Sequence, residues 1–312
     1  MIRFSVVIPA YNEVGTVQEL YDRVVAVLTK MNEPWEIVYV DDGSHDGTSE
    51  ALDKLAASDD RIVVIHQPGN FGKSAAYTAA FRRLRGEIVF TLDADLQDEP
   101  GEMPNLLAAI QGGSDLVIGW KRGRMQNEPL KRIPSGVFNA MMTRSFGLKL
   151  TDSNSGIRGM TRAVVDTLVL YGDLYRFIPQ LAHTAGFRVT EIPVEHHARK
   201  HGVSKYGAKR FWTGALDLLT VRFLTRYRER PLHFFATAGL GPLVLGTLIE
   251  LLVLAAKLAG HTFQEHVAAI IVGVLLILLG FQAIAVGLIA ELISGQLQHI
   301  RHERDRSESR PR

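Results

Sequence analysis

Two aspartates two residues apart, Asp93 and Asp95, form the sharpest chemical signal in the sequence. They directly follow an apolar run, and in an extended segment residues two apart point to the same side. Two carboxylates that face one point suit a hard divalent cation, since Mg²⁺ takes one or two carboxylates and completes its shell with water and phosphate oxygens. Gln97, two residues further on, can add a third oxygen. The segment therefore predicts a site for Mg²⁺ or Mn²⁺ with a phosphorylated ligand.

Other polar groups follow other apolar runs. Pro9, Tyr11 and Glu13 come at or after the end of the first run, and the pair Asp41 and Asp42 follows the second. Carboxylates therefore collect at the ends of predicted strands, which is where open parallel sheets bind their ligands.

Two familiar phosphate-binding motifs do not match. Residues 69–74 (GNFGKS) resemble a Walker loop, but that motif needs a glycine five residues before its second glycine, and position 67 is Gln67. No G-x-G-x-x-G follows the first apolar run, which argues against a dinucleotide-dependent oxidoreductase.

These residues need a scaffold of alternating strands and helices. Short, nearly continuous apolar runs predict buried strands over residues 4–8, 35–40, 61–65, 87–92 and 115–120. Helical patterns lie between them, over residues 16–30, 48–57, 73–85 and 102–111. Short strands that alternate with helices along the chain imply right-handed crossovers, so we predict an α/β fold with a mostly parallel sheet flanked by helices.

The composition excludes several classes of site. The chain has 312 residues, which suits one large domain or two. Its 35 Lys and Arg against 33 Asp and Glu give a net charge of +2, so the overall charge does not indicate nucleic acid as a partner. The chain has no cysteine, which excludes disulfides, cysteine–zinc sites, iron–sulfur clusters and thiol nucleophiles.

Two long apolar runs predict a transmembrane hairpin. They cover residues 234–256 and 267–290, and a spanning helix needs about 20 residues. Glu250 is the single formal charge inside either run, and we expect it to mark a helix–helix or subunit contact. A buried hairpin of core helices is the alternative. Basic residues before the first run and in the tail, together with the absence of an N-terminal signal peptide, predict an inner (cell) membrane protein with both termini cytoplasmic.

The sequence divides into four predicted parts. We expect a cytoplasmic catalytic domain over residues 1–207, an amphipathic juxtamembrane helix over 208–230, the hairpin over 231–296 and a charged cytoplasmic tail over 297–312. In residues 208–230 apolar residues recur at helical spacing among basic ones, which is typical of a helix lying on anionic headgroups. An ordinary surface helix is the alternative.

The motifs taken together resemble family 2 glycosyltransferases, the inverting GT-A group. Four of them occur in chain order: VVIPAYNE (residues 6–13), DDGSHDGT (41–48), NFGKSAA (70–76) and DADLQDEP (93–100). Residues 176–207, RFIPQLAHTAGFRVTEIPVEHHARKHGVSKYG, followed by two predicted spans, are more specifically similar to polyprenyl-phosphate glycosyltransferases. This group includes dolichyl-phosphate mannose synthases and bacterial undecaprenyl-phosphate glycosyltransferases. The resemblance implies a Rossmann-like GT-A fold and inverting, metal-dependent transfer of a sugar from a nucleotide-sugar donor to undecaprenyl or dolichyl phosphate.

The resemblance also implies roles for individual residues. It assigns donor binding to Pro9, Tyr11, Glu13, Asp41, Asp42, Lys73, Asp93, Arg199, Ser204 and Lys205. It assigns the metal to Asp93, Asp95 and Gln97, and catalytic contacts, including those to the acceptor phosphate, to Asp93, Asp95, Lys121, Arg124, Arg132 and Ser135. Asp152 and Ser155 belong near the same site. Lys121 departs from the family pattern, in which arginine is commoner.

Two alternatives stay open at this point. The chain could be a family 2 enzyme acting on another membrane acceptor, such as a glycolipid or polysaccharide, although the Q-x-x-R-W motif of processive synthases is absent from the sequence. It could also be a non-catalytic, nucleotide-sugar-binding membrane subunit. We further expect a homo-oligomer packed through the spans, because the small residues Gly239, Gly241 and Gly246 lie on the first one.

Overall fold

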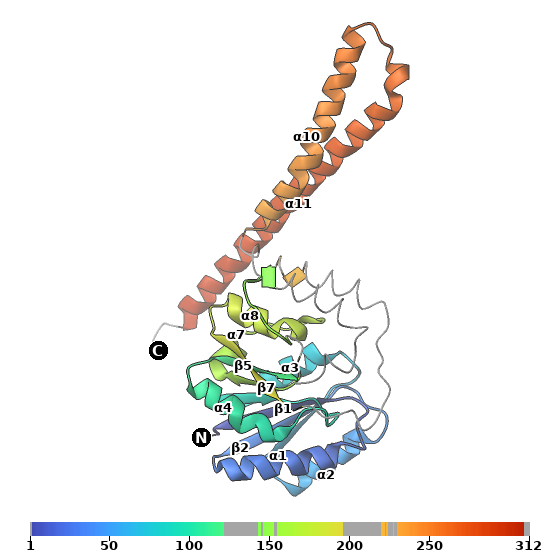
Figure 1. The fold of residues 1–312 in the computed structure, drawn as a ribbon. Helices are drawn as coiled ribbons and strands as arrows, with labels where there is room; N and C mark the ends of the chain where they lie inside the picture. Colours follow the sequence, from blue (N-terminus) through green and yellow to red (C-terminus); the bar gives the residue numbers. More distant parts are fainter. Residues whose placement is uncertain are drawn as a thin grey trace. The chain divides into compact units, whose positions relative to one another are not determined.

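The computed structural model describes residues 2–121, 143–144, 146–152, 155–195, 220–221, 223, 227 and 230–308, without the side chains of residue 121 and of residues 297–308. The chain separates into two compact units, Met1–Val221 and Arg222–Arg312. The first unit contains an α/β sheet, and the second contains two long helices (Figure 1).

In the described residues, the first unit is built on a seven-stranded sheet. Its strands are β1 (Phe4–Ala10), β2 (Trp35–Asp41), β3 (Ile62–His66), β4 (Ile88–Thr91), β5 (Leu116–Lys121), β6 (Arg158–Thr161) and β7 (Val189–Val194), in the order β3-β2-β1-β4-β6-β5-β7. β6 runs antiparallel to its neighbours β4 and β5, and the other pairs are parallel. The carboxyl ends of six strands therefore meet at one edge of the sheet, together with the amino end of β6.

Helices cover both faces of this sheet (Figure 1). They are α1 (Val17–Met31), α2 (Thr48–Ser58), α3 (Lys73–Phe81), α4 (Met103–Gln111), α7 (Arg162–Thr167) and α8 (Ile178–Thr184), with 3₁₀ turns η1 (Pro100–Glu102) and η3 (Leu174–Phe177). α1 buries Val17, Leu20, Val24 and Leu28 at helical spacing against one face, where α4 adds Leu106 to the same core. α3 and α8 pack on the other face.

The predicted fold class is confirmed. All five predicted strands and all four predicted helices are present, and their ends differ from the predicted ones by at most four residues. β6 and β7 were not predicted, because neither is a continuous apolar run. β6 reads RGMT, with Arg158 and Gly159 in half of its positions, and β7 reads VTEIPV, with Pro193 inside it.

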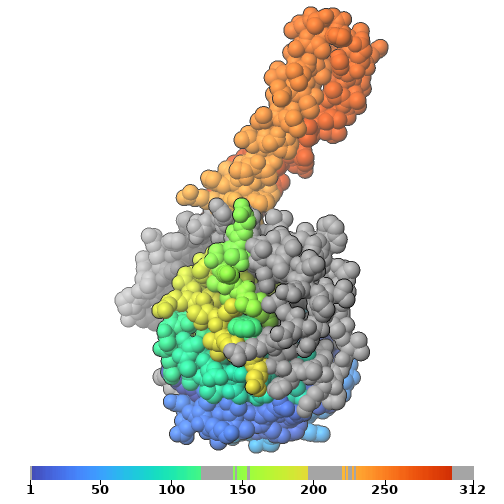
Figure 2. Space-filling view, viewed as in Figure 1, coloured from blue at the N-terminus to red at the C-terminus, as the bar shows by residue number. Residues whose placement is uncertain are grey.

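Two apolar helices make up most of the second unit. α10 (Pro231–Leu258) and α11 (Val267–Glu308) are joined through η4 (Phe263–His266). Pro231–Leu258 and Phe263–Gln296 are each long and apolar enough to cross a membrane, and most of their side chains are exposed (Figure 2). This exposure disfavours the alternative of a buried core hairpin. α11 also continues past residue 296 to Glu308, so the predicted tail is largely helical.

Glycines bring the two helices into close contact. A Cβ added at Gly239 would lie 2.6 Å from the carbonyl oxygen of Gly280, and one added at Gly280 would lie 2.6 Å from that of Gly239. A Cβ at Gly246 would lie 2.5 Å from the carbonyl oxygen of Gly273. Gly239 and Gly246, which the sequence assigns to subunit contacts, therefore pack inside the chain's own hairpin, whereas Gly241 has open space around it.

Glu250 lies in this same interface. A Cβ added at Gly273 would meet the carboxyl oxygen Oε1 of Glu250. The helix–helix contact expected for Glu250 is thus found between α10 and α11.

The start of α10 is held by aromatic contacts. The ring centroids of Phe223 and Tyr227 lie 5.5 Å and 5.3 Å from that of Phe234. Phe223 and Tyr227 belong to the predicted juxtamembrane helix, most of which lies outside the described residues.

Candidate active site

The carboxyl edge of the sheet gathers the loops that carry the predicted donor and metal residues. The loops after β1, β2, β3 and β4 and the segment before β6 all reach this edge. Pro9, Tyr11 and Glu13, at the end of β1 and in its following loop, are each half-buried. Ligands of open α/β sheets bind at such an edge, near a change in strand order.

The loops after β1 and β2 are tied together by hydrogen bonds. Asn12 has a left-handed φ of 56°. Its backbone amide donates to Ser44 Oγ at 3.0 Å, and its Oδ1 accepts from the amide of His45 at 2.9 Å. The amide of Glu13 donates to Thr48 Oγ1 at 2.9 Å. Tyr11 and Glu13 are therefore presented by a firmly connected pair of loops.

Asp41 and Asp42 stabilise the loops around them. Asp41 accepts from the amide of Ser44 at 3.0 Å and from Ser49 Oγ. The two oxygens of Asp42 accept from the amides of Phe71 at 2.8 Å and Gly72 at 2.9 Å. Both aspartates are almost fully buried, and Asp42 fixes the loop that leads into α3 relative to the end of β2.

Their surroundings shift their pKa values in opposite directions. Burial raises the pKa of Asp42, even though the amides of Phe71 and Gly72 favour its charged form. Burial acts in the same direction on Asp41, but hydrogen bonds from Ser44, Ser49 and His66 outweigh it and lower the pKa of Asp41. Asp41 is therefore ionised at neutral pH.

A tight turn follows β4 and carries the predicted metal ligands. Asp93 lies two residues beyond the end of β4, and the backbone turns at once, with Leu96 at a left-handed φ of 60°. Asp95 Oδ1 accepts from the amide of Gln97 at 3.2 Å, which closes the turn. The extended geometry predicted for Asp93 and Asp95 is therefore wrong, because the chain reverses there, and the convergence of their side chains on one ion stays a prediction.

Gly156, just before β6, leaves the space that the Asp93 carboxylate occupies. A Cβ at this position would lie 2.5 Å from Asp93 Cγ and 2.6 Å from Asp98 Oδ2. Asp98 is 1% exposed, and its Oδ2 accepts from the amide of Asp93 at 3.1 Å. Asp98 thus fixes the backbone of Asp93, and Gly156 leaves room for its side chain.

The Asp93 carboxylate also holds a cation of the chain itself. The ammonium of Lys73, the first residue of α3, pairs with Asp93 Oδ1. Burial alone would lower the pKa of Lys73, but the charge of Asp93 raises it above its usual value. A second cation, Arg158 at the start of β6, is 1% exposed, and its charge acts on both Lys73 and Tyr77.

Several predicted residues lie outside the described residues. They are Arg124, Arg132, Ser135, Arg199, Ser204 and Lys205. Lys121 ends β5 at the carboxyl edge, with only its backbone described. Asp152 and Ser155 come shortly before β6, and Ser155 is fully buried. The predicted acceptor residues therefore remain predictions.

Three residues at this site escaped sequence reasoning. Asp98 belongs to the same acidic segment as Asp93 and Asp95, so its residue type and position could have indicated a place in the site. Gly156 and Arg158 lie in the D-x-x-S-G-I-R segment, but their place beside Asp93 depends on the pairing of β6 with β4. That pairing was not predicted.

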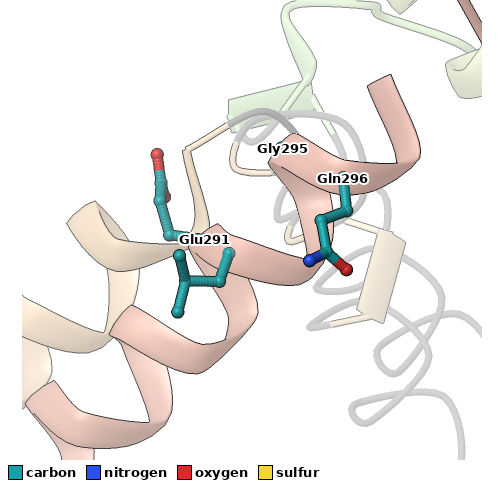
Figure 3. Close-up of a pocket in the computed structure, with 4 residues that line it drawn as sticks. Glu291, Gly295 and Gln296 are labelled. Atoms are coloured by element: carbon teal, nitrogen blue, oxygen red, sulfur yellow. The ribbon is translucent and has the colours of Figure 1, made fainter. Parts of the chain in front are cut away.

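Two other features of the second unit do not resemble an active site. A pocket along α11 is lined by Glu291, Leu292, Gly295 and Gln296, all from one helix (Figure 3). Glu291 accepts there from the amide of Leu232 at 3.0 Å, which caps the start of α10.

At the hairpin turn, His261, Glu265 and His266 come close enough to hold a metal ion. Glu265 forms a capping box with Thr262 and accepts from His261 Nδ1 at 3.0 Å, so its contacts are those of a helix cap.

Comparison with known proteins decides the family. The model of the family described as "Glycosyl transferase family 2" matches residues 5–169, more than half of the chain. The chain belongs to glycosyl transferase family 2. It is therefore a glycosyltransferase, and the predicted family resemblance is confirmed.

Curated relatives of this glycosyltransferase place it in the polyprenyl-phosphate group. It is 36% identical over 304 residues to a dodecaprenyl-phosphate galacturonate synthase of Rhizobium johnstonii, with 94% of this chain and 88% of the relative covered. It is also 36% identical over 299 residues to an undecaprenyl-phosphate 4-deoxy-4-formamido-L-arabinose transferase of Pseudomonas fluorescens, with 95% and 86% covered. Since both alignments cover nearly the whole chain, they include the apolar hairpin.

Solved structures confirm the GT-A fold. A glucosyl-3-phosphoglycerate synthase from Mycobacterium tuberculosis, in complex with Mn²⁺, UDP-glucose and phosphoglyceric acid, has a TM-score of 0.55 at 19% identity, with 72% of this chain and 79% of that chain covered. A mannosyl-3-phosphoglycerate synthase from Rubrobacter xylanophilus has a TM-score of 0.56 at 19% identity, with 71% and 74% covered.

Proposed function

We propose that this glycosyltransferase moves a sugar from a nucleotide-sugar donor to a polyprenyl phosphate, with inversion at the anomeric carbon. Relatives aligned over nearly the whole chain are named as transferases of this kind. The observation that carries the proposal is the acidic turn after β4, whose Asp93 is held by Asp98, Gly156 and Lys73 at the ligand-binding edge of the sheet.

The residues of this turn fit a divalent cation. The carboxylates of Asp93 and Asp95 and the amide oxygen of Gln97 are hard ligands of the kind that Mg²⁺ and Mn²⁺ prefer. Gly156 leaves the room that the Asp93 carboxylate occupies, and this carboxylate already pairs with a cation, the ammonium of Lys73. We assign these three ligands to the ion, which when bound neutralises negative charge on the departing diphosphate.

The chain's own residues position the two reactants. Pro9, Tyr11 and Glu13 lie where the nucleoside is expected, at the end of β1 and in a loop that hydrogen bonds tie to the loop after β2. The bond between the anomeric carbon and the diphosphate breaks, and the nucleoside diphosphate leaves with the electron pair. An acceptor phosphate oxygen forms the new bond from the opposite side, so the configuration inverts.

The acceptor needs orientation more than deprotonation. A lipid phosphate is already largely ionised near neutral pH, so no strong general base is required. We assign Lys121, Arg124 and Arg132, with Ser135, to the acceptor phosphate, because a guanidinium offers two parallel N–H groups to phosphate oxygens.

The apolar hairpin explains how the enzyme meets a lipid acceptor. Each buried CH₂ of a polyprenyl tail is worth about 0.8 kcal/mol, so the tail stays in the bilayer and the catalytic unit must be held at its surface. α10 and α11 suit such an anchor. Basic residues before the hairpin and in its tail favour a cytoplasmic catalytic unit at the inner membrane.

A thermal-shift screen of the purified full chain in mild detergent tests the donor site. Nucleotide sugars are added with Mn²⁺, with Mg²⁺ or with EDTA. We expect at least one of them to raise the melting temperature with a metal and not with EDTA, since a ligand at 100 times its Kd adds about 2.7 kcal/mol to stability.

Two substitutions test whether the metal-dependent shift in this screen depends on Asp93. Asp93→Asn should lose the metal-dependent shift, and Asp60→Asn, an exposed aspartate remote in sequence from the turn, should keep it. A shift of equal size in EDTA, or one that survives Asp93→Asn, would show that the metal assignment is wrong.

A further inference from the structure

Lys73 and Asp93 form an ion pair at the position that the proposed metal would occupy. The Lys73 ammonium contacts Asp93 Oδ1, and the two side chains are 25% and 30% exposed. The pair is therefore partly open to solvent and can be reached by a ligand. The ammonium of Lys73 sits on a flexible four-carbon stem, so it can move more freely than the carboxylate of Asp93.

Aromatic rings flank the ammonium of Lys73. Its Nζ lies 5.8 Å from the ring centroid of Tyr77 on α3 and 5.5 Å from that of Tyr175 on η3. A cation within about 6 Å of such a ring is attracted to its face. These rings give the ammonium favourable surroundings beside Asp93 that do not depend on the carboxylate.

A second, fixed cation lies next to this pair. Arg158 belongs to β6 and is 1% exposed, and among the described residues its Nε and one terminal nitrogen have no hydrogen-bond partner. Its charge opposes that of Lys73. The Lys73–Asp93 pair thus has a buried cation close enough to repel its ammonium, while the carboxylate attracts it.

We propose that Lys73 is an exchangeable counter-ion, which occupies Asp93 in the ligand-free enzyme and moves to the donor's diphosphate when a divalent cation takes Asp93. The inference rests on the proposed function, because it takes Asp93 as a metal ligand. An ammonium and a dication compete for the charge of one carboxylate, so a metal ion on Asp93 weakens the hold of that carboxylate on Lys73. The repulsion from Arg158 favours its departure, and a diphosphate supplies new negative charge for it.

This exchange makes metal and nucleotide binding depend on each other. Metal alone must displace Lys73 without giving the ammonium a new partner, so its affinity is reduced. Once a nucleoside diphosphate is present, the displaced ammonium gains a phosphate oxygen, so the metal binds more tightly. By linkage, the metal must raise the affinity for the nucleotide by the same factor.

Mn²⁺ binding followed by electron paramagnetic resonance tests the exchange without any sugar transfer. The full chain in mild detergent is titrated with Mn²⁺, alone and with UDP or GDP. In Lys73→Met we expect Mn²⁺ alone to bind about fivefold or more tightly than in the unsubstituted chain, and the nucleotide to add less to that affinity. Lys54→Met, which removes an exposed lysine on α2, is the matched control and should match the unsubstituted chain.

The outcomes separate this inference from the proposed function. If Lys73 merely binds phosphate, Lys73→Met will lower the affinity for the nucleotide and leave the affinity for Mn²⁺ alone unchanged. That result would refute the exchange and leave the metal site standing. If Asp93→Asn retains full Mn²⁺ binding, the metal site and the exchange both fail. Tighter Mn²⁺ binding in Lys73→Met with reduced coupling, lost in Asp93→Asn, supports both.

Discussion

At the scale of residues, Asp93 is positioned by contacts with other described parts of the chain. Asp98 accepts from its amide, Gly156 leaves space for its side chain and Lys73 neutralises it. The types and positions of Asp93, Asp95 and Gln97 could be predicted, because acidic residues after a buried strand point to one edge of a sheet. The turn at Leu96 could not be predicted, because leucine rarely adopts a left-handed backbone conformation and its residue type does not indicate one.

Gly156 gives a prediction at this scale. Gly156→Ala places a Cβ 2.5 Å from Asp93 Cγ, so the carboxylate or the segment before β6 must move. We expect Mn²⁺ affinity and turnover to fall by about tenfold to a hundredfold, since small displacements of reacting groups cost that much. Metal titration and steady-state kinetics measure the two effects.

The matched control is Gly15→Ala. Gly15 has open space where its Cβ would lie and does not require a left-handed backbone, so this substitution should change neither quantity. Unaltered Mn²⁺ affinity and turnover in Gly156→Ala would mean that the space beside Asp93 has no part in the site.

At the scale of elements, the strands that could be predicted are those with a nearly continuous apolar run. β1 and β2 are each buried along nearly their whole length, and their runs are recognisable in sequence. β6 has no such run, because Arg158 and Gly159 take two of its four positions. The element that brings Gly156 and Arg158 to Asp93 was therefore the one that sequence patterning missed.

The hairpin yields a prediction at this scale. Gly280→Leu inserts a side chain where the backbone of Gly239 lies 2.6 Å from the added Cβ, so α10 and α11 must separate locally. Overpacking of this kind costs about 1–3 kcal/mol, and we expect a lower melting temperature in mild detergent, followed by circular dichroism.

Gly241→Leu introduces the same side chain at a glycine with open surroundings on the same pair of helices. It should leave the hairpin's melting temperature close to that of the unsubstituted chain. Equal losses in the two variants would contradict the glycine contacts between α10 and α11.

At the scale of the whole molecule, one chain carries a GT-A catalytic unit and an apolar hairpin. The family and the fold are established by the match over residues 5–169 and by the solved relatives. The hairpin could be predicted from hydrophobicity alone, because about 20 apolar residues are needed to cross a bilayer. The expected homo-oligomer stays a prediction, and Gly239 and Gly246 no longer support it, because both pack within the chain.

The most direct test is sugar transfer by the purified full chain from radiolabelled nucleotide sugars to undecaprenyl phosphate in detergent micelles. We expect a labelled, solvent-extractable sugar lipid that forms with Mg²⁺ or Mn²⁺ and does not form with EDTA. We also expect Asp93→Asn to reduce its formation by about 10²–10³-fold, because a group that stabilises developing charge is lost. Undiminished product in EDTA, or labelled product with a glycolipid acceptor and none with any polyprenyl phosphate, would contradict the proposed function.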